Sequence, residues 1–218
     1  MKTNKTAIIA GASGQIGNYL LHDLLESKQY EKVIALVRNP LGISHPKLQE
    51  IKVDFTNPDT LKIKADDVFC CLGTTIKTAN TKENFKAVDY GYPMALAQAT
   101  LASGASRFFV VSSAGTSLDS SIFYAKVKAE MERDLQKIGF NALYIFKPSM
   151  LLGPRKEFRF GELMGKFFMQ ILAPLIPKKY KGVQASKVAE SMLHCANTSS
   201  EGVHFIDNEQ ILSCPSFK

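Results

Sequence analysis

The sequence predicts an α/β fold in which helices cover both faces of one doubly wound, mostly parallel sheet of about seven strands. Two patterns support this class: short apolar runs alternate with stretches of helical periodicity, and the runs are apolar throughout, as expected of strands buried on both faces. With 218 residues, 45% of them hydrophobic, and with no repeat or linker, the chain is expected to form a single domain over residues 1–218.

Seven apolar runs are the expected strands. In chain order they occupy residues 6–10, 33–37, 50–54, 67–73, 107–113, 142–147 and 202–206. The segments between them with apolar residues near i, i+3, i+4 and i+7 are the expected helices, such as NYLLHDLLES, AVDYGYPMALAQATLASG, YAKVKAEMERDLQKIG and SKVAESMLHCAN. The stretch from about 150 to 185 breaks the alternation. We expect it to form an excursion over the crevice at the carboxyl ends of the strands, where ligands bind in such sheets.

The first expected strand is followed by GASGQIG at 11–17, a glycine-rich loop that opens the first helix. Gly11 would allow a tight turn, Gly14 would let backbone N–H groups reach a pyrophosphate, and Gly17 would let helix and strand pack closely. The helix N-terminus would add further N–H groups and a partial positive charge. The loop therefore predicts a dinucleotide site, with a purely structural turn as the alternative.

The end of the second strand bears on the choice of dinucleotide. Proteins that bind NAD usually carry Asp or Glu here for the ribose hydroxyls, whereas this strand ends in ALVRNP and offers Arg38. A guanidinium can fork onto an adenosine 2′-phosphate, so we expect NADPH to be preferred over NADH. After the third strand, Asp54 and Phe55 are candidates for the edge and face of the adenine, although an Asp at a strand end also commonly starts a turn.

A catalytic group is predicted after the fifth strand, in VVSSAGTSLDSSIFYAKVKAEMERDL. Tyr124 and Lys128 are four residues apart on an expected helix and therefore share a face. A tyrosine ionises near pH 10, so an enzyme that uses one as a proton donor or acceptor needs a cation beside it, which Lys128 would supply. A serine at the strand end would hold the substrate oxygen beside Tyr124. Ser113 is the candidate, with Ser112 as the alternative.

These segments together resemble the short-chain dehydrogenase/reductases, and specifically the atypical branch that contains the Tat-interactive-protein oxidoreductases. The resemblance covers nearly the whole chain and is carried by GASGQIG, CCLGTT at 70–75, SSAGTSLDSSIFYAKVKAEME at 112–132 and FKPSMLLGPRKEFRFGE at 146–162. It implies a seven-stranded parallel Rossmann sheet and NADPH as the cofactor.

The resemblance also implies a role for individual residues. Tyr124 would be the proton donor or acceptor, and Lys128 would also bind the nicotinamide ribose. The implied cofactor contacts are Ser13, Gly14, Gln15 and Ile16 at the phosphates, Arg38 at the 2′-phosphate, Leu72, Gly73 and Thr74 along the adenosine side, and Pro148, Leu151 and Arg159 over the nicotinamide half. One position departs from the wider superfamily: where a catalytic Asn often follows Val, this chain has Val88 and Asp89. A water relay built on Asn is therefore in doubt.

Composition and charge restrict the classes of partner that the sequence predicts. The net charge of +7 arises from residues 147–187, whereas a nucleic-acid protein would spread basic residues along a groove or arm with aromatic partners, so no nucleic acid is expected. The four cysteines show neither a C-x-x-C motif nor metal-ligand spacing, which predicts reduced thiols and no metal site. The early apolar run is too short for a signal peptide, and no run of about 20 apolar residues could span a membrane. We expect a cytoplasmic protein.

Two functions remain open from the sequence. The first is an NADPH-dependent oxidoreductase that transfers hydride to a small-molecule carbonyl substrate, either apolar or anionic, while Tyr124 protonates the oxygen. The second is a regulatory protein that binds NADPH as a redox signal and contacts protein partners with little or no catalysis. Retention of Ser113, Tyr124 and Lys128 together favours the enzyme. Sugar-nucleotide epimerisation is disfavoured, because the chain is short for the substrate domain of such relatives.

Overall fold

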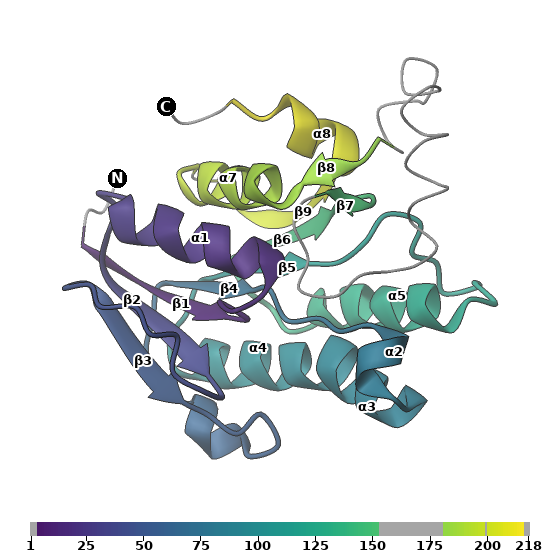
Figure 1. The fold of residues 1–218 in the computed structure, drawn as a ribbon, viewed down its shortest axis with the longest axis horizontal. Coiled ribbons are helices and arrows are strands. Elements are labelled where there is room, and N and C mark those ends of the chain that lie inside the picture. The colour runs from purple at the N-terminus through teal and green to yellow at the C-terminus, as the bar shows by residue number, and fades with distance from the viewer. Residues whose placement is uncertain (1–3, 153–180, 199, 216–218) are drawn as a thin grey trace.

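The computed structural model describes residues 4–152, 181–198 and 200–215. Its centre is a seven-stranded sheet of order β3-β2-β1-β4-β5-β6-β9, and every pair of neighbours is parallel (Figure 1). The strands are β1 (Lys5–Ala10), β2 (Tyr30–Val37), β3 (Leu48–Lys52), β4 (Asp67–Cys70), β5 (Arg107–Val111), β6 (Ala142–Lys147) and β9 (Gly202–Asp207). The predicted fold class is thus confirmed, with a sheet that is parallel throughout.

Helices cover both faces of this sheet (Figure 1). On one face α1 (Gln15–Glu26) packs beside α7 (Ala185–Ala196), and on the other lie α4 (Tyr92–Ala102) and α5 (Phe123–Leu135). Each long helix was expected from its apolar periodicity. From β1 the chain adds β2 and then β3 on one side of the sheet. It then returns to the centre, where β4 pairs with β1 on the side opposite β2.

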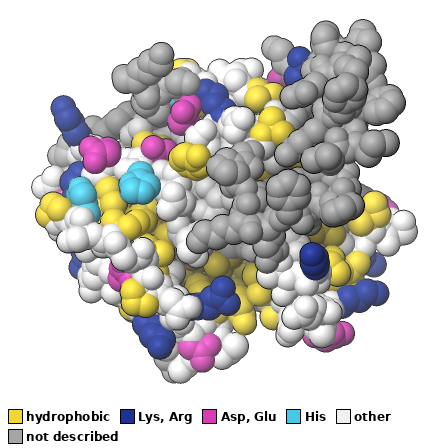
Figure 2. All heavy atoms as spheres, viewed as in Figure 1, with side chains coloured by type: hydrophobic (Ala, Val, Ile, Leu, Met, Phe, Trp, Pro, Cys, Tyr) yellow, Lys and Arg dark blue, Asp and Glu magenta, His cyan; other side chains and the backbone are white. Residues whose placement is uncertain are grey.

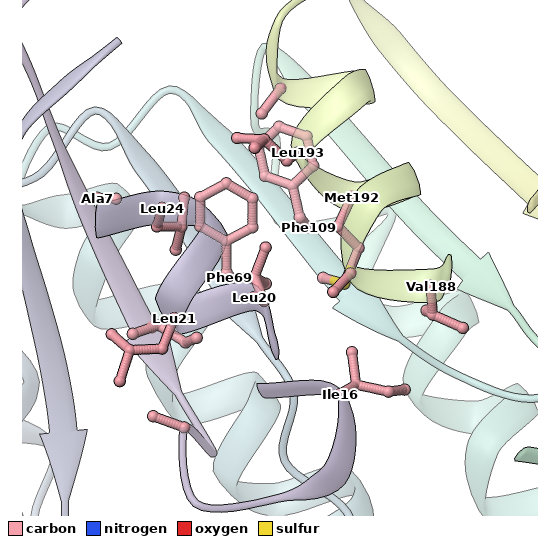
Figure 3. Packing of buried hydrophobic residues seen from close by; sticks show 14 of the residues in the cluster. Ala7, Ile16, Leu20, Leu21, Leu24, Phe69, Phe109, Val188, Met192 and Leu193 are labelled. Carbon is pink, nitrogen blue, oxygen red and sulfur yellow. The ribbon is translucent and has the colours of Figure 1, made fainter. Parts of the chain in front are cut away.

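The continuous apolar strands are explained by the two cores that they separate. In β1, Ala7 and Ile9 face α1 and α7, while Ile8 and Ala10 face α4 and α5. Figure 3 shows the first of these cores, where Leu20 and Leu24 of α1 lie close to Phe69 of the sheet. A strand with helices on both faces has no solvent side, so apolar residues occupy consecutive positions. The edge strands β3 and β9 are more exposed, and their sequences are more polar.

Several short elements were not predicted from the sequence. They are a 3-10 turn (Pro58–Leu61), α2 (Ile76–Ala79), α3 (Lys82–Lys86), a π-helical turn (Ala87–Gly91), the paired strands β7 (Leu151–Leu152) and β8 (Val183–Gln184), and α8 (Asn208–Ser213). The fourth and fifth strands end at Cys70 and Val111, three and two residues earlier than expected. The residues left over form the loops that line the carboxyl edge of the sheet.

The excursion expected over about 150–185 lies outside the described residues except at its two ends. Those ends are held together by Asn208, the first residue of α8, whose side chain is buried. Its Oδ1 accepts the backbone N–H of Ser149 at 2.9 Å, and its Nδ2 donates to the carbonyl of Lys181, also at 2.9 Å. The β7–β8 pair adds a second link between the same two segments.

Candidate functional site

The candidate site lies where β1 and β4 adjoin at the carboxyl edge of the sheet. The strand order reverses at this point: from β1 the chain builds outward to β3, and from β4 it builds outward in the opposite direction. In open α/β sheets the loops that leave two such strands diverge, so a crevice opens between them. The loops after β1 and β4 contain the predicted GASGQIG and CCLGTT segments.

The glycine loop follows β1 as predicted, and each glycine has its own reason to be there. Gly11 has a φ of +87°, and a Cβ on it would come within 2.6 Å of the carbonyl oxygen of Cys71, directly after β4. A Cβ on Gly17 would lie 2.1 Å from the Gly11 carbonyl oxygen, so only glycine permits the close packing of α1 on the loop. Gly14 is exposed and is the N-cap of α1. The turn and packing roles are confirmed, while phosphate contacts for Ser13, Gly14, Gln15 and Ile16 stay a prediction.

The loop after β4 is held in place by a hydrogen bond to a buried carboxylate. Asp89, in the π-helical turn between α3 and α4, is 1% exposed. Its Oδ2 accepts the backbone N–H of Thr74 at 2.8 Å. Gly73 is exposed, and a Cβ on it would lie 3.5 Å from Asp89 Oδ1. The backbone of the predicted cofactor segment Leu72 to Thr74 is therefore anchored beside the glycine loop.

Lys128 is buried in the same place. Its Nζ lies 2.8 Å from Asp89 Oδ1 and 3.5 Å from the carbonyl oxygen of Val111, the last residue of β5. Burial opposes the charge on Lys128, but the Asp89 carboxylate, and to a smaller extent Tyr124, outweigh it and raise the pKa of the ammonium. Lys128 is thus a fixed cation at the junction of β4, β5 and α5.

Tyr124 lies one turn before Lys128 on α5 and is half-buried. Its ring packs against Phe85 of α3, with the ring centroids 5.6 Å apart. No hydrogen bond links its hydroxyl to any other residue in the described part of the chain, so within that part the group is available to a ligand. The predicted pairing of Tyr124 with Lys128 on one face of a helix is the arrangement found.

The two serines after β5 have different partners. Ser112 is buried and donates a short hydrogen bond to the Glu132 carboxylate of α5. That carboxylate also receives the hydroxyl of Thr116 at 2.9 Å and the ammonium of Lys147 at 2.9 Å. The hydroxyl of Ser113 is only half-buried and donates to the adjacent Ala114 carbonyl at 3.2 Å. Ser113 therefore has the more accessible hydroxyl, whereas Ser112 belongs to an internal polar cluster.

The residues proposed for the adenosine half are spread along the edge. Arg38 is exposed directly after β2. Asp54 uses its carboxylate in its own turn, accepting the backbone N–H of Thr56 at 2.9 Å and the Thr56 hydroxyl at 2.7 Å. Phe55 is buried and stacks on Tyr92 of α4, with the ring centroids 5.2 Å apart. Both side chains already have partners within the protein. Contacts of Asp54 and Phe55 with adenine stay a prediction.

The residues expected over the nicotinamide half lie only partly within the described structure. Pro148, directly after β6, is buried, and its carbonyl accepts the N–H of Ala114 at 2.9 Å. Leu151 is half-buried in β7 and packs at the margin of the core formed with α1 and α7. Arg159 lies outside the described residues. Pro148 thus ties the end of β6 to the loop that holds Ser113.

Two buried carboxylates near the candidate residues were not predicted from the sequence. Asp89 was noted only as a departure from Asn, and Glu132 was not singled out. Both are buried carboxylates on helical segments; Asp89 meets the buried Lys128, and Glu132 meets the half-buried Lys147. The signal available in the sequence is weak, because an acidic residue within a helical segment is most often a solvated one.

On the face drawn in Figure 2, lysine and arginine side chains lie scattered among acidic ones over the described part of the chain. Within that part, no group of three or more histidine, cysteine, aspartate or glutamate side chains could hold a metal ion. No described helix is long and apolar enough to cross a membrane.

Comparisons with known proteins place these features in a family. Residues 11–197 match the model of a family described as NAD(P)H-binding. The chain is 31% identical over 215 residues to Protein HTATIP2 of Rattus norvegicus, covering 96% of this chain and 88% of the relative. It is 28% identical over 216 residues to a protein of Eremothecium gossypii named "Protein FMP52, mitochondrial", covering 95% of this chain and 96% of the relative.

Solved structures share the fold at lower sequence identity. MoeE5, in complex with UDP-glucose and NAD, superposes with a TM-score of 0.69 at 18% identity, covering 95% of this chain and 80% of the other. UDP-glucose 4-epimerase of Thermotoga maritima, with UDP-glucose, gives a TM-score of 0.68 at 14% identity, covering 93% and 76%. At these identities the likeness concerns the fold alone.

Proposed function

The chain belongs to the NAD(P)H-binding family, and on that premise we propose that it is an NADP(H)-dependent oxidoreductase that reduces a small-molecule carbonyl compound, with Tyr124 as the proton donor. The observation that carries this proposal is that Tyr124 and Lys128 lie one turn apart on α5, with the Lys128 ammonium held against the end of β5, two residues before Ser113. A protein that only bound the cofactor would need no proton donor there.

The residues present fit a dinucleotide. Gly14 and Gly73 both expose backbone, one on each side of the divergence, so that a ligand can approach both loops closely. The N-terminus of α1 carries no acidic residue in its first turn that would repel a phosphate. Arg38 would pair with an adenosine 2′-phosphate, which is the basis for preferring NADPH. Bound NADPH would supply a hydride to the carbonyl carbon.

The chain itself would supply the proton and the orientation. Ser113 would donate a hydrogen bond to the substrate oxygen and hold it beside the Tyr124 hydroxyl. Tyr124 would donate its proton to that oxygen as the carbonyl becomes an alcohol, and the charge left on the phenolate would be stabilised by the Lys128 ammonium. In the reverse direction the same groups would accept the proton of an alcohol.

The test is the oxidation of NADPH by the wild type and by Tyr124→Phe, measured with a panel of aldehydes, ketones and quinones. We expect turnover by the wild type and a loss of about 10²- to 10⁴-fold in the variant, because its phenyl ring has no proton to give. NADPH affinity, titrated in parallel, should persist. Tyr19→Phe, which alters an exposed tyrosine on α1, is the matched control and should keep full turnover.

Tight NADPH binding without turnover for any carbonyl would favour a regulatory protein that binds NADPH as a redox signal and contacts protein partners. The cytoplasmic location expected from the sequence stays a prediction, and the fungal relatives carry "mitochondrial" in their names.

A further inference from the structure

The Asp89 carboxylate is a junction between three parts of the candidate site. One oxygen faces the Lys128 ammonium of α5 at 2.8 Å, and the other accepts the Thr74 N–H of the loop after β4 at 2.8 Å. Both side chains of the ion pair are nearly inaccessible, with 4% of Lys128 and 1% of Asp89 exposed. The carboxylate itself lies on a π-helical turn, a rare element that often marks functional positions.

The chemistry of these contacts explains why this position holds Asp rather than Asn. Lys128 and the Thr74 backbone both offer N–H donors, so the side chain between them must present two acceptors. A carboxylate has two acceptor oxygens, whereas an amide has one oxygen and one donor group. An asparagine would therefore lose one of the two contacts in either orientation, and it would leave a buried ammonium without a counter-charge.

We propose that Asp89 is a positioning residue of this site, which locks the Lys128 ammonium to the loop of residues 71–75 and sets the pH at which the Tyr124–Lys128 pair releases its proton. The proposal rests on the proposed function for its catalytic meaning. The geometry on which it stands, a buried carboxylate with one donor on each oxygen, is independent of any reaction.

The direction of the pH effect follows from charge. The titratable groups that face Lys128 from the described elements are Asp89 of the π-helical turn, Tyr124 of α5 and Cys70 of β4. Burial raises the pKa of the Cys70 thiol to about 11, so this group is neutral near pH 7. Among the described residues, Asp89 is then the negatively charged group that faces the pair. Removing it lowers the affinity of the pair for its proton, whichever of the two residues releases that proton.

The experiment compares the wild type with Asp89→Asn. In the cofactor-free protein, carbon-13 NMR of labelled tyrosine and lysine side chains follows the titration of the Tyr124–Lys128 pair, with signals assigned through Tyr124→Phe and Lys128→Met. We expect Asp89→Asn to lower the pH of proton release by about one to three pH units, as for the loss of an opposite charge in contact. Asp119→Asn, which changes an exposed loop residue in the same way, is the control and should leave the titration unchanged.

Activity supplies the second readout. For carbonyl reduction the pair must hold its proton, so the alkaline limb of kcat should move to lower pH by a similar amount in Asp89→Asn. If Asp89 only supports the fold, the variant will unfold at a lower temperature while both pH profiles stay in place, and the proposal is overturned. Should wild-type turnover be absent, the proposed function fails, but the NMR titration still decides the role of Asp89.

A second variant covers the case in which Asp89→Asn does not fold. Lys128→Met removes the cation and keeps the carboxylate, so the titration of Tyr124 should move to higher pH than in the wild type. An unchanged Tyr124 titration in Lys128→Met would overturn the proposal as firmly as an unchanged profile in Asp89→Asn.

Discussion

At the scale of single residues, Ser112 and Ser113 are chemically identical neighbours whose surroundings separate their roles. Ser112 is buried and bonded to Glu132, which also binds Thr116 and Lys147. Ser113 is half-buried and bonded only weakly to the next carbonyl in the described structure. The Ser112 hydroxyl already donates to the buried Glu132 carboxylate and would have to give up that hydrogen bond to bind a substrate. Catalysis is therefore expected to depend on Ser113.

Alanine substitutions should resolve this difference. We expect Ser113→Ala to lower kcat by about tenfold or more, as for the loss of a donor to the reacting oxygen, with little change in the free energy of unfolding. Ser112→Ala should instead cost about 1–3 kcal/mol of stability, because it removes a hydrogen-bond donor to the buried Glu132 carboxylate. Urea denaturation and steady-state kinetics on both variants check this assignment, and a large kinetic loss confined to Ser112→Ala would reverse it.

The structural role of a residue could be predicted from the sequence only where the motif spacing is strict. The Tyr124 to Lys128 spacing fixes a shared helix face, and Gly11 with Gly17 fixes the turn after β1. The close approach of Cys71 to Gly11 could not be foreseen, because it depends on how β4 pairs with β1. The partner of Asp89 was beyond reach for the same reason: its contacts lie 15 and 39 positions away in the chain.

At the scale of elements, α1 and α7 cover the sheet together and bring two acidic side chains close. Asp23 of α1 is partly buried facing Glu190 of α7, which is paired with Lys187 at 3.1 Å. Burial, and then the charge of Glu190, raise the pKa of Asp23 to about 6. A carboxyl whose pKa is higher in the folded state destabilises the fold as it ionises, so its cost appears as pH rises from about 4 to about 6.

Asp23→Asn should therefore stabilise the protein in a pH-dependent way. Allowing for the partial exposure of the carboxyl, we expect a gain of about 1 kcal/mol at neutral pH, or about 2–4 °C in Tm, and almost none near pH 3.5. Thermal unfolding at both pH values measures this, with Glu26→Gln on the exposed side of α1 as the control. A gain of equal size at both pH values would contradict the assignment.

Helices and strands could be predicted where burial gives the apolar residues a regular spacing in the sequence. Strands covered on both faces are continuously apolar and amphipathic helices repeat near every fourth residue, so the seven strands and four long helices were foreseen. The helices α2 and α3 span only four and five residues, too few to show a period. The π-helical turn was hidden because its residues continue the apolar pattern of α4.

At the scale of the whole molecule, a buried carboxylate at the amino edge of the sheet joins four strands. Asp67 at the start of β4 is fully buried. It accepts hydrogen bonds from Arg107 of β5 at 2.6 Å and from Tyr30 of β2 at 2.7 Å, and Lys5 of β1 lies 3.7 Å away. This network lies at the opposite end of the strands from the candidate site, so it serves the sheet and not the chemistry.

Removal of Asp67 should weaken the entire fold. Asp67→Ala leaves the Arg107 guanidinium half-buried without its counter-charge, and we expect a loss of about 3–5 kcal/mol in urea denaturation. Glu130→Ala, which breaks the surface pair with Lys86, is the comparison and should cost no more than about 1 kcal/mol. Equal effects in the two variants would mean that the Asp67 network contributes no more than a surface ion pair.

Binding of NADPH at the carboxyl edge of this sheet is tested most directly by calorimetric titration with NADPH and NADH. We expect the wild type to bind NADPH more tightly than NADH. Arg38→Met should lower NADPH affinity by about tenfold or more while leaving NADH affinity unchanged, because only the 2′-phosphate meets the guanidinium. Arg133→Met, on the exposed side of α5, should change neither. Binding of neither nucleotide by the wild type would contradict the claim.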